Sequence, residues 1–271
     1  MSVALKRWFS VFLVAFGFVV LLGADPALAE LQPKDQHRQL FEQALRFSRQ
    51  GDPQKALEGW DQVLELAPDD AAAWSNRGNV RLVLGDTEGA IADQTKAIEL
   101  APEEADPHLN RGTAEEALQD WTAAEQDYNW ILKRDPEDAS ALYNLGNVRG
   151  SEGDWESAET LYGRAAEARP GFAMARSSRA LALYQLEAFD EAEREMRNLI
   201  RRYPMFADAR AGLSALLWIR GSKGEAESNW AAASGLDPSY READWLLQVR
   251  RWPPRPVADL QRLLALEMES S

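Results

Sequence analysis

Residues 74–80 read WSNRGNV, residues 108–114 read HLNRGTA, and residues 142–148 read LYNLGNV. Each phrase stands 34 residues after the one before it. The same spacing holds over most of the 271-residue chain, in six frames that follow one another without an insertion. The frames cover residues 37–70, 71–104, 105–138, 139–172, 173–206 and 207–240. An internal period of this length predicts a stack of copies of one small structural unit.

Two positions are invariant across the frames. Position 20 is always alanine, at Ala56, Ala90, Ala124, Ala158, Ala192 and Ala226. Position 32 is always proline, at Pro68, Pro102, Pro136, Pro170, Pro204 and Pro238. Position 15 is glycine in four frames, and position 16 is aspartate in four. Glycine readily adopts the left-handed conformation that ends a helix, aspartate caps the next helix, and proline stops it. Each frame is therefore predicted to form a helical hairpin.

Small and large residues stand at fixed positions of the frame, which lets its two helices pack closely. Position 8 is small, at Gly78, Gly112, Gly146 and Ala180, and position 24 is aromatic at Trp60, Tyr128, Tyr162 and Trp230. With Trp74 and Leu142 at position 4, this pattern resembles the tetratricopeptide repeat family. The resemblance covers residues 37–240. It implies an all-α, right-handed solenoid of six hairpins, whose first helices line a concave groove that binds a protein or peptide.

Position 7, where the family commonly has leucine, is arginine in three frames. Position 23, on the second helix, is acidic in the same three frames, which gives the pairs Arg77–Asp93, Arg111–Asp127 and Arg179–Glu195. In the fourth frame both positions are apolar, as Leu145 and Leu161. A buried arginine needs a partner carboxylate, so we predict a cross-helix ion pair in three frames and an apolar contact in the fourth. The alternative is that these arginines bind a ligand.

Polar residues stand where the resemblance places the concave groove. They are Asn76, Asn110 and Asn144 at position 6 and Asn79, Thr113 and Asn147 at position 9. Their side chains can hold the backbone of an extended peptide, because amides both donate and accept hydrogen bonds. The plainer alternative is that they serve solubility or local hydrogen bonds.

Three aromatic residues also fall on groove positions: Tyr143, Tyr184 and Trp218. They are candidate anchors for a partner, with packing between adjacent hairpins as the alternative. The Lys and Arg side chains that clamp the C-terminal carboxylate of chaperones are missing from the groove positions. We therefore do not expect a chaperone-tail receptor.

The first residues have the layout of an export signal. Lys6 and Arg7 precede an apolar run over residues 8–22, and small residues precede Glu30. This order predicts a signal peptide over residues 1–29, followed by a short segment over residues 30–36. An uncleaved membrane anchor is the alternative. The repeats and the signal resemble those of exported cyanobacterial repeat proteins, some of which assist photosystem assembly. The resemblance implies the periplasm or the thylakoid lumen as the location.

Residues 241–271 are expected to cap the array. Residues 240–249 read as one helix, and a second is expected to begin at Pro256 and to run to about Met268. The RWPPRP stretch between them, residues 251–256, is predicted to be an extended connector, because proline blocks helix continuation. Alternatively, it is itself a ligand for an aromatic groove.

Composition narrows the function. A net charge of −14 argues against nucleic acid binding. Cysteine is absent and the two histidines lie far apart, so we expect no metal and no other cofactor. No nucleophile, base or phosphate-loop motif predicts an enzyme. We expect a non-catalytic scaffold that binds a protein or an extended peptide, as an assembly or maintenance factor. The alternative is a self-associating structural protein of the envelope, held in the membrane by an uncleaved signal segment.

Overall fold

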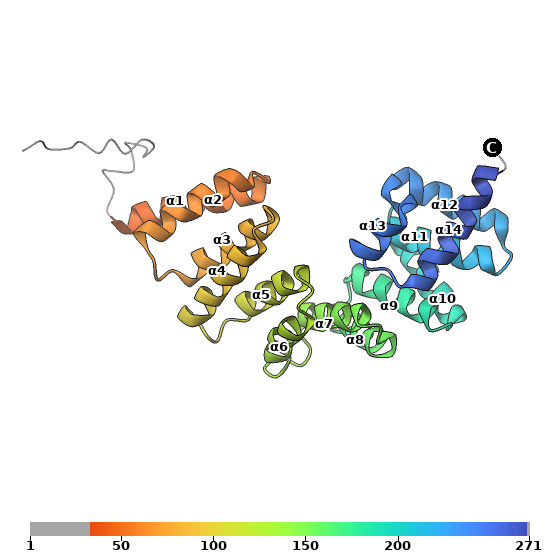
Figure 1. Ribbon diagram of the computed structural model, residues 1–271, viewed down its shortest axis with the longest axis horizontal. Helices are drawn as coiled ribbons and strands as arrows, with labels where there is room; N and C mark the ends of the chain where they lie inside the picture. The colour runs from red at the N-terminus through yellow and green to blue at the C-terminus, as the bar shows by residue number, and fades with distance from the viewer. Residues whose placement is uncertain (1–32, 270–271) are drawn as a thin grey trace, which may run out of the picture.

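The computed structural model describes residues 33–269, in which the chain is helical and contains no strand. The expected signal peptide lies outside the described residues. Six helical hairpins follow one another along the arc in Figure 1. Their first helices are α1 (Pro33–Gln50), α3 (Ala71–Val83), α5 (Ala105–Ala117), α7 (Ala139–Ser151), α9 (Ala173–Gln185) and α11 (Ala207–Ile219). Their second helices are α2 (Pro53–Leu66), α4 (Thr87–Leu100), α6 (Trp121–Leu132), α8 (Trp155–Ala168), α10 (Phe189–Arg202) and α12 (Lys223–Leu236).

Each hairpin turns at position 15 of its frame, where the backbone is left-handed. The φ angles lie between 72° and 85° at Gly51, Gly85, Gly153 and Gly221. In the third and fifth hairpins Gln119 and Glu187 adopt the same conformation, with φ of 61° and 64°. A residue with a side chain pays about 1–2 kcal/mol for this conformation. The packing of the two helices therefore fixes the turn even where glycine is missing.

The aspartates at position 16 cap the second helices, as the frame pattern predicts. In four hairpins the aspartate carboxylate accepts a hydrogen bond from a backbone N–H three residues further on, at 3.0–3.3 Å. These residues are Asp52, Asp86, Asp120 and Asp154. Each cap satisfies one of the amide groups that a helix leaves free at its start.

The first helices form the inner row of the arc. Contacts join α1 to α3, α3 to α5, α5 to α7 and α9 to α11. Second helices of successive hairpins have no comparable contact within residues 33–269. Helices on the inside of a curve lie closer together, so the first helices line the concave face and the second helices the convex face (Figure 1).

The C-terminal segment folds back onto the concave face. After the short helices η1 (Pro238–Arg241) and α13 (Ala243–Gln248), the last helix α14 (Pro254–Glu269) packs against α9 and α11. The sequence-based bounds were wrong here: α14 begins at Pro254 and not at Pro256, and the helix expected over residues 240–249 is replaced by η1 and α13. Both prolines fit in the first turn of α14 because that turn needs no backbone N–H donors.

Candidate binding groove

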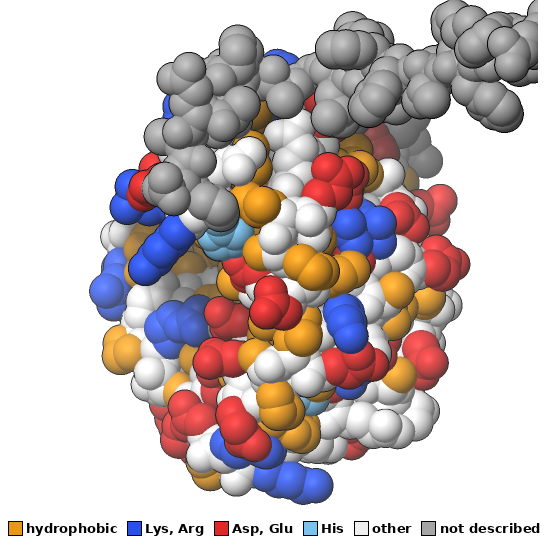
Figure 2. Space-filling view, turned by 90° about the vertical axis from the view of Figure 1, so that its left-hand side faces the viewer, with side chains coloured by type: hydrophobic (Ala, Val, Ile, Leu, Met, Phe, Trp, Pro, Cys, Tyr) orange, Lys and Arg blue, Asp and Glu red, His pale blue; other side chains and the backbone are white. Residues whose placement is uncertain are grey.

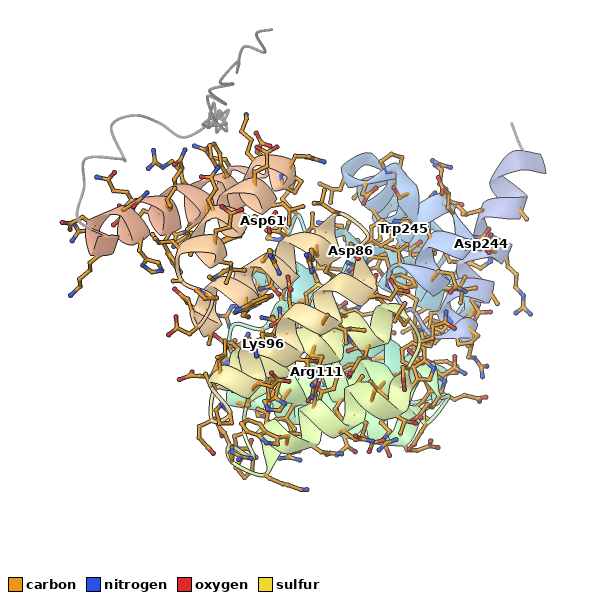
Figure 3. The ribbon with its side chains drawn as sticks, turned by 60° about the vertical axis from the view of Figure 1, so that its left-hand side comes forward. Asp61, Asp86, Lys96, Arg111, Asp244 and Trp245 are labelled. Carbon is orange, nitrogen blue, oxygen red and sulfur yellow. The ribbon has the colours of Figure 1, made fainter. Side chains whose placement is uncertain are left out.

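The position-7 arginines connect the two helices of a hairpin. Arg77 donates from Nε and Nη2 to the two carboxylate oxygens of Asp93, at 2.8 Å each. Arg111 makes the same forked contact with Asp127, at 2.7 and 2.8 Å; Figure 3 labels Arg111 on its helix. Asp93 and Asp127 are only 2% and 3% exposed. Hydrogen bonding to these carboxylates raises the pKa of both arginines. The charges of Arg77 and Arg111 are therefore paired with carboxylates inside the scaffold.

The third pair differs from the prediction. Arg179 donates from Nε to Glu159 of the preceding hairpin at 2.6 Å, while the predicted partner Glu195 lies 3.9 Å from Nη1. Gly163 explains the difference, because a Cβ atom there would lie 3.3 Å from Nε of Arg179. The missing side chain leaves room for the arginine to lean toward Glu159. In the fourth frame Leu145 is buried, and Leu161 packs against the same apolar cluster.

The position-6 asparagines form a row along the inner helices. Asn76 donates to the carbonyl of Ala72 at 2.8 Å, and Asn110 donates to Oγ of Ser75 on the preceding first helix at 3.2 Å. Asn144 lies 3.5 Å from Oγ1 of Thr113, again one hairpin back. No donor within residues 33–269 contacts the Oδ1 atoms of these three asparagines. The row therefore presents carbonyl oxygens that can accept hydrogen bonds from another chain.

The position-9 residues have a more local role. Oδ1 of Asn79 accepts a hydrogen bond from Gln94 at 3.0 Å, and Oδ1 of Asn147 accepts one from the hydroxyl of Tyr162 at 3.0 Å. Thr113 donates to the carbonyl of Leu109 in its own helix, also at 3.0 Å. In these two frames, the asparagine at position 9 therefore hydrogen-bonds to the residue at position 24 on the second helix. Only the amide nitrogen of the asparagine is left for a ligand.

A cavity of about 540 Å³ lies on the inner side of α3 and α5. Its wall includes Asn76, Asn79 and Asn110 of the predicted set. Asp69, Asp70, Glu104 and Asp106 also line it, and within the described part of the chain no Lys or Arg does. This part of the groove is open, polar and negatively charged.

The three aromatic candidates do not share one environment. Tyr143 is half-buried, with its ring centre 5.0 Å from that of Phe172, and burial raises its pKa. Tyr184 is fully buried and donates from its hydroxyl to Asp259 of α14 at 3.1 Å. The expectation that Tyr184 faces an open groove was therefore wrong, because the C-terminal helix covers it. Trp218 is half-buried against the same C-terminal core.

Residues 249–253, VRRWP, cross the concave side between α13 and α14 and are called the strap below. One buried carboxylate, Asp208 at the start of α11, binds two of its side chains. Asp208 accepts hydrogen bonds from Arg250 at 2.7 Å and from the indole of Trp252 at 3.0 Å. It also accepts from Tyr240 at 2.9 Å and Ser177 at 2.8 Å. The sequence did not identify Asp208 as a functional residue, because nothing in its local sequence distinguishes it from other acidic residues at the starts of helices.

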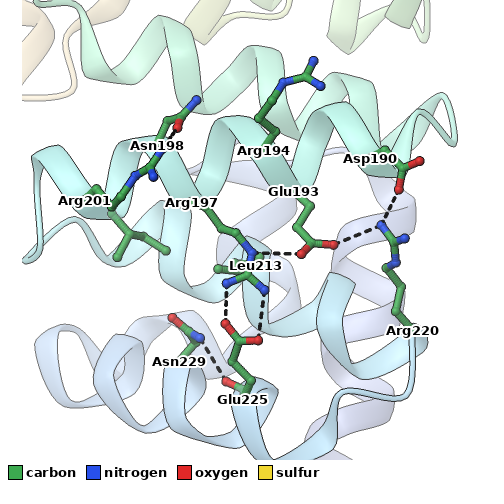
Figure 4. A pocket seen from close by; sticks show the side chains of 11 residues that line it. Asp190, Glu193, Arg194, Arg197, Asn198, Arg201, Leu213, Arg220, Glu225 and Asn229 are labelled. Atoms are coloured by element: carbon green, nitrogen blue, oxygen red, sulfur yellow. Dashed lines mark hydrogen bonds and ion pairs between the residues drawn. The ribbon is translucent and has the colours of Figure 1, made fainter.

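Other surfaces carry mixed charge. A hollow of about 660 Å³ between α10 and α12 on the convex side is crossed by ion pairs (Figure 4). Arg197 bridges Glu193 and Glu225 there, and Arg220 bridges Asp190 and Glu193. At the N-terminal end of the arc, Figure 2 shows acidic, basic and hydrophobic side chains interspersed. Neither surface has an excess of one charge comparable to the cavity between α3 and α5.

Two further properties concern chemistry and membranes. Among the residues that the structure describes, no three His, Cys, Asp or Glu side chains converge as metal ligands would. Between residues 33 and 269, no helix combines the length and the apolar character needed to cross a bilayer.

The fold and the repeats agree with known proteins. The family model for the tetratricopeptide repeat matches residues 41–105, 109–171, 146–196 and 179–241, so the chain belongs to the tetratricopeptide repeat family. Its fold is that of protein–protein interaction scaffolds. No curated protein matches the chain in sequence.

Solved structures of this fold cover most of the chain. A tetratricopeptide repeat protein from Parabacteroides merdae is similar over 84% of this chain and 92% of its own, with 21% identity and a TM-score of 0.63. PilF from Pseudomonas aeruginosa is similar over 76% and 94%, with 17% identity and a TM-score of 0.66. YrrB, described as a repeat protein with an unusual peptide-binding site, is similar over 72% and 100%, with 21% identity and a TM-score of 0.52.

Proposed function

We propose that the protein is a non-catalytic scaffold that binds an extended segment of another protein along the open part of its concave groove. The observation that carries this proposal is the row of Asn76, Asn110 and Asn144. Their Oδ1 atoms accept no hydrogen bond from the described residues and recur one hairpin apart. An extended peptide offers backbone N–H groups that such a row can pair with. The peptide-binding site described for YrrB adds support from the same fold.

The compartment is part of the proposal. The export layout of residues 1–29 supports a role in the periplasm or the thylakoid lumen, where the protein acts as an assembly or maintenance factor. The acidic wall of the cavity between α3 and α5 favours partner segments without negative charge at that point.

A capture experiment tests the groove. Wild-type protein and the triple variant Asn76→Ala, Asn110→Ala and Asn144→Ala are used as bait in the exported fraction of the source cells. We expect the triple variant to capture at least tenfold less of the specifically bound partner than the wild type. Each replacement of an asparagine by alanine removes one or more hydrogen bonds to the peptide backbone.

The matched control places three alanines on the convex side, at Gln62, Gln126 and Thr160, which are exposed on α2, α6 and α8. This variant should retain the partner. If the groove variant keeps its melting temperature and still captures every partner that the wild type captures, binding does not use the groove.

A further inference from the structure

One ion pair closes the concave side between parts of the chain that are far apart in sequence. Arg251 of the strap donates to Glu116 at the end of α5, 135 residues earlier. The same carboxylate accepts a hydrogen bond from the hydroxyl of Tyr128. The guanidinium carbon of Arg251 lies 5.9 Å from the ring centre of Trp121. We call Glu116, Trp121 and Tyr128 the cradle.

The cradle requires a cation. Glu116 is only 4% exposed, and a carboxylate removed from water without a positive partner is strongly unfavourable. Its place in the last turn of α5 adds to this demand, because the C-terminal end of a helix carries partial negative charge. Tyr128 supplies a hydrogen bond but no charge. Whatever occupies the cradle must therefore bring a positive group.

The shape of the cradle favours arginine over lysine. An aromatic ring, Trp121, stands beside the carboxylate, and a planar guanidinium can pair with a carboxylate while lying against a ring face. Arg251 does both in this structure.

There is room beside the cradle for more than a guanidinium. A cavity of about 460 Å³ lies beside the cradle. The turns of the third and fourth hairpins form one side of it, and the C-terminal segment forms the other. Trp121, Gly150 and Trp155 line it from the repeats, and Leu247 and Trp252 line it from the other side. The wall also includes the polar side chains of Gln119, Ser151 and Gln248, so the cavity offers aromatic surfaces for an aromatic or proline side chain and polar groups beside them.

Arg251 is held less firmly than its neighbours. Its side chain is 32% exposed and makes one ion pair, whereas Arg250 and Trp252 both bind the buried Asp208. Its backbone is left-handed, with φ of 55°, which disfavours any residue other than glycine. Removing Arg251 from the cradle leaves the Asp208 contacts in place.

We propose that the cradle is a binding site for an arginine that neighbours an aromatic or proline residue in an extended partner segment, and that Arg251 occupies it in the absence of that partner. This inference rests on the proposed function, because it identifies one side chain that the bound segment carries. The strap is then an internal copy of the ligand, and binding requires exchange of one arginine for another at Glu116.

The exchange can be measured with a synthetic probe. A fluorescent peptide VRRWPP, the sequence of residues 249–254, is titrated against full-length protein by anisotropy. We expect Arg251→Ala to bind it at least tenfold more tightly than the wild type, because the internal competitor is gone. Replacing the second peptide arginine by alanine, or Glu116 by glutamine in the Arg251→Ala protein, should each reduce affinity at least tenfold.

Arg255→Ala is the matched control. Arg255 is a nearby arginine whose guanidinium contacts Glu187 and not Glu116, so its loss should leave the affinity at the wild-type value. Equal binding by wild type and Arg251→Ala, or binding that survives loss of Glu116 or of the peptide arginine, would overturn the proposal.

A second measurement does not depend on any variant. Saturating VRRWPP should change the NMR signals of the Arg251 guanidinium in the wild type and leave those of Arg250, which stays paired with Asp208, and unchanged Arg251 signals contradict the proposal. Light scattering adds a further outcome: a wild-type dimer that Arg251→Ala converts to a monomer would place the arginine of a second copy in the cradle and overturn the internal assignment.

The two proposals fail separately. Loss of captured partners in the asparagine variant together with no peptide binding at the cradle would refute only the arginine site. Arginine-dependent peptide binding together with unchanged capture by the asparagine variant would refute only the asparagine groove.

Discussion

At the scale of single residues, Arg77 and Arg111 each join three helices. Each holds an aspartate of its own hairpin and reaches back to the preceding one, Arg77 to Asp61 at 2.7 Å and Arg111 to Thr95 at 3.2 Å. Replacing a well-packed buried ion pair by apolar residues of similar volume is often neutral or stabilising. The leucine pair at positions 7 and 23 of the fourth frame can therefore replace the ion pair without loss of stability, provided that both positions change together.

Glu115, which lies 3.8 Å from Nε of Arg111, makes the free energy of unfolding depend on pH. Burial and the charge of Asp127 raise the pKa of Glu115 to about 7, against the opposing effect of Arg111. The unfolded chain loses this proton near pH 4.5, so between these pH values the folded state binds the extra proton. The stability contribution is present below the unfolded pKa and is lost as the pH rises through 7.

Glu115→Gln should therefore stabilise the protein at pH 8 by on the order of 2 kcal/mol, with most of the difference gone at pH 5. Urea unfolding at both pH values measures it. Glu65→Gln on the surface of α2 serves as the control and should show a much smaller dependence. A difference between wild type and Glu115→Gln that does not change with pH would contradict the buried-charge explanation.

At the scale of the helical hairpin, the separation of the two helices is set at positions 8 and 24. A Cβ atom on Gly112 would lie 2.7 Å from Cε1 of Tyr128, and one on Gly146 would lie 2.7 Å from Cε1 of Tyr162. Both tyrosines are buried. Alanine stands at position 8 in the fifth frame, as Ala180, where position 24 is a methionine that adapts more easily to its surroundings.

Gly146→Ala should accordingly destabilise the protein by about 1–3 kcal/mol through overpacking. Gly235→Ala, the same change near the end of α12, meets no atom within 4 Å and should stabilise by about 0.5–1 kcal/mol through helix propensity. Thermal and urea unfolding of the two variants compare them directly. Equal stabilities would show that the tyrosine does not limit the approach of the helices.

At the scale of the whole molecule, the C-terminal segment changes how the array holds together. In a simple repeat array each unit contacts only its neighbours. Here α14 covers α9 and α11, and the strap reaches the third hairpin through Glu116. The C-terminal half of the groove is thereby filled, and Trp245 of α13 lies among the C-terminal helices in Figure 3. The part of the groove along α3 and α5 stays open.

Asp208→Ala tests this coupling, because it removes the shared acceptor of the strap. We expect a loss of about 3 kcal/mol or more and faster hydrogen exchange in residues 238–269, with α3 and α4 unchanged. Asp190→Ala is the control, since this aspartate is 86% exposed and its ion pair with Arg220 contributes little. Uniformly faster exchange along the chain would mean that Asp208 supports the whole array and not the C-terminal unit.

Much of the fold and part of the candidate site follow from local residue types. The period of 34 residues, the glycine and aspartate at each turn and the invariant alanine and proline predict the hairpins and their order. The joint change of positions 7 and 23 identifies the Arg77–Asp93 and Arg111–Asp127 contacts, because a buried charge leaves its partner little choice. The asparagine row follows from the same register.

The tertiary structure alone decides which groove residues are accessible. Tyr184 stands at a groove position, yet it is buried because α14, which begins 70 residues later, folds back over it. The lean of Arg179 depends on space left by Gly163, and the partnership of Arg251 with Glu116 joins positions 135 residues apart. A repeat period fixes contacts within and between neighbouring hairpins. It carries no information about where a non-repeating tail will lie, since that depends on surfaces created only when the array has assembled.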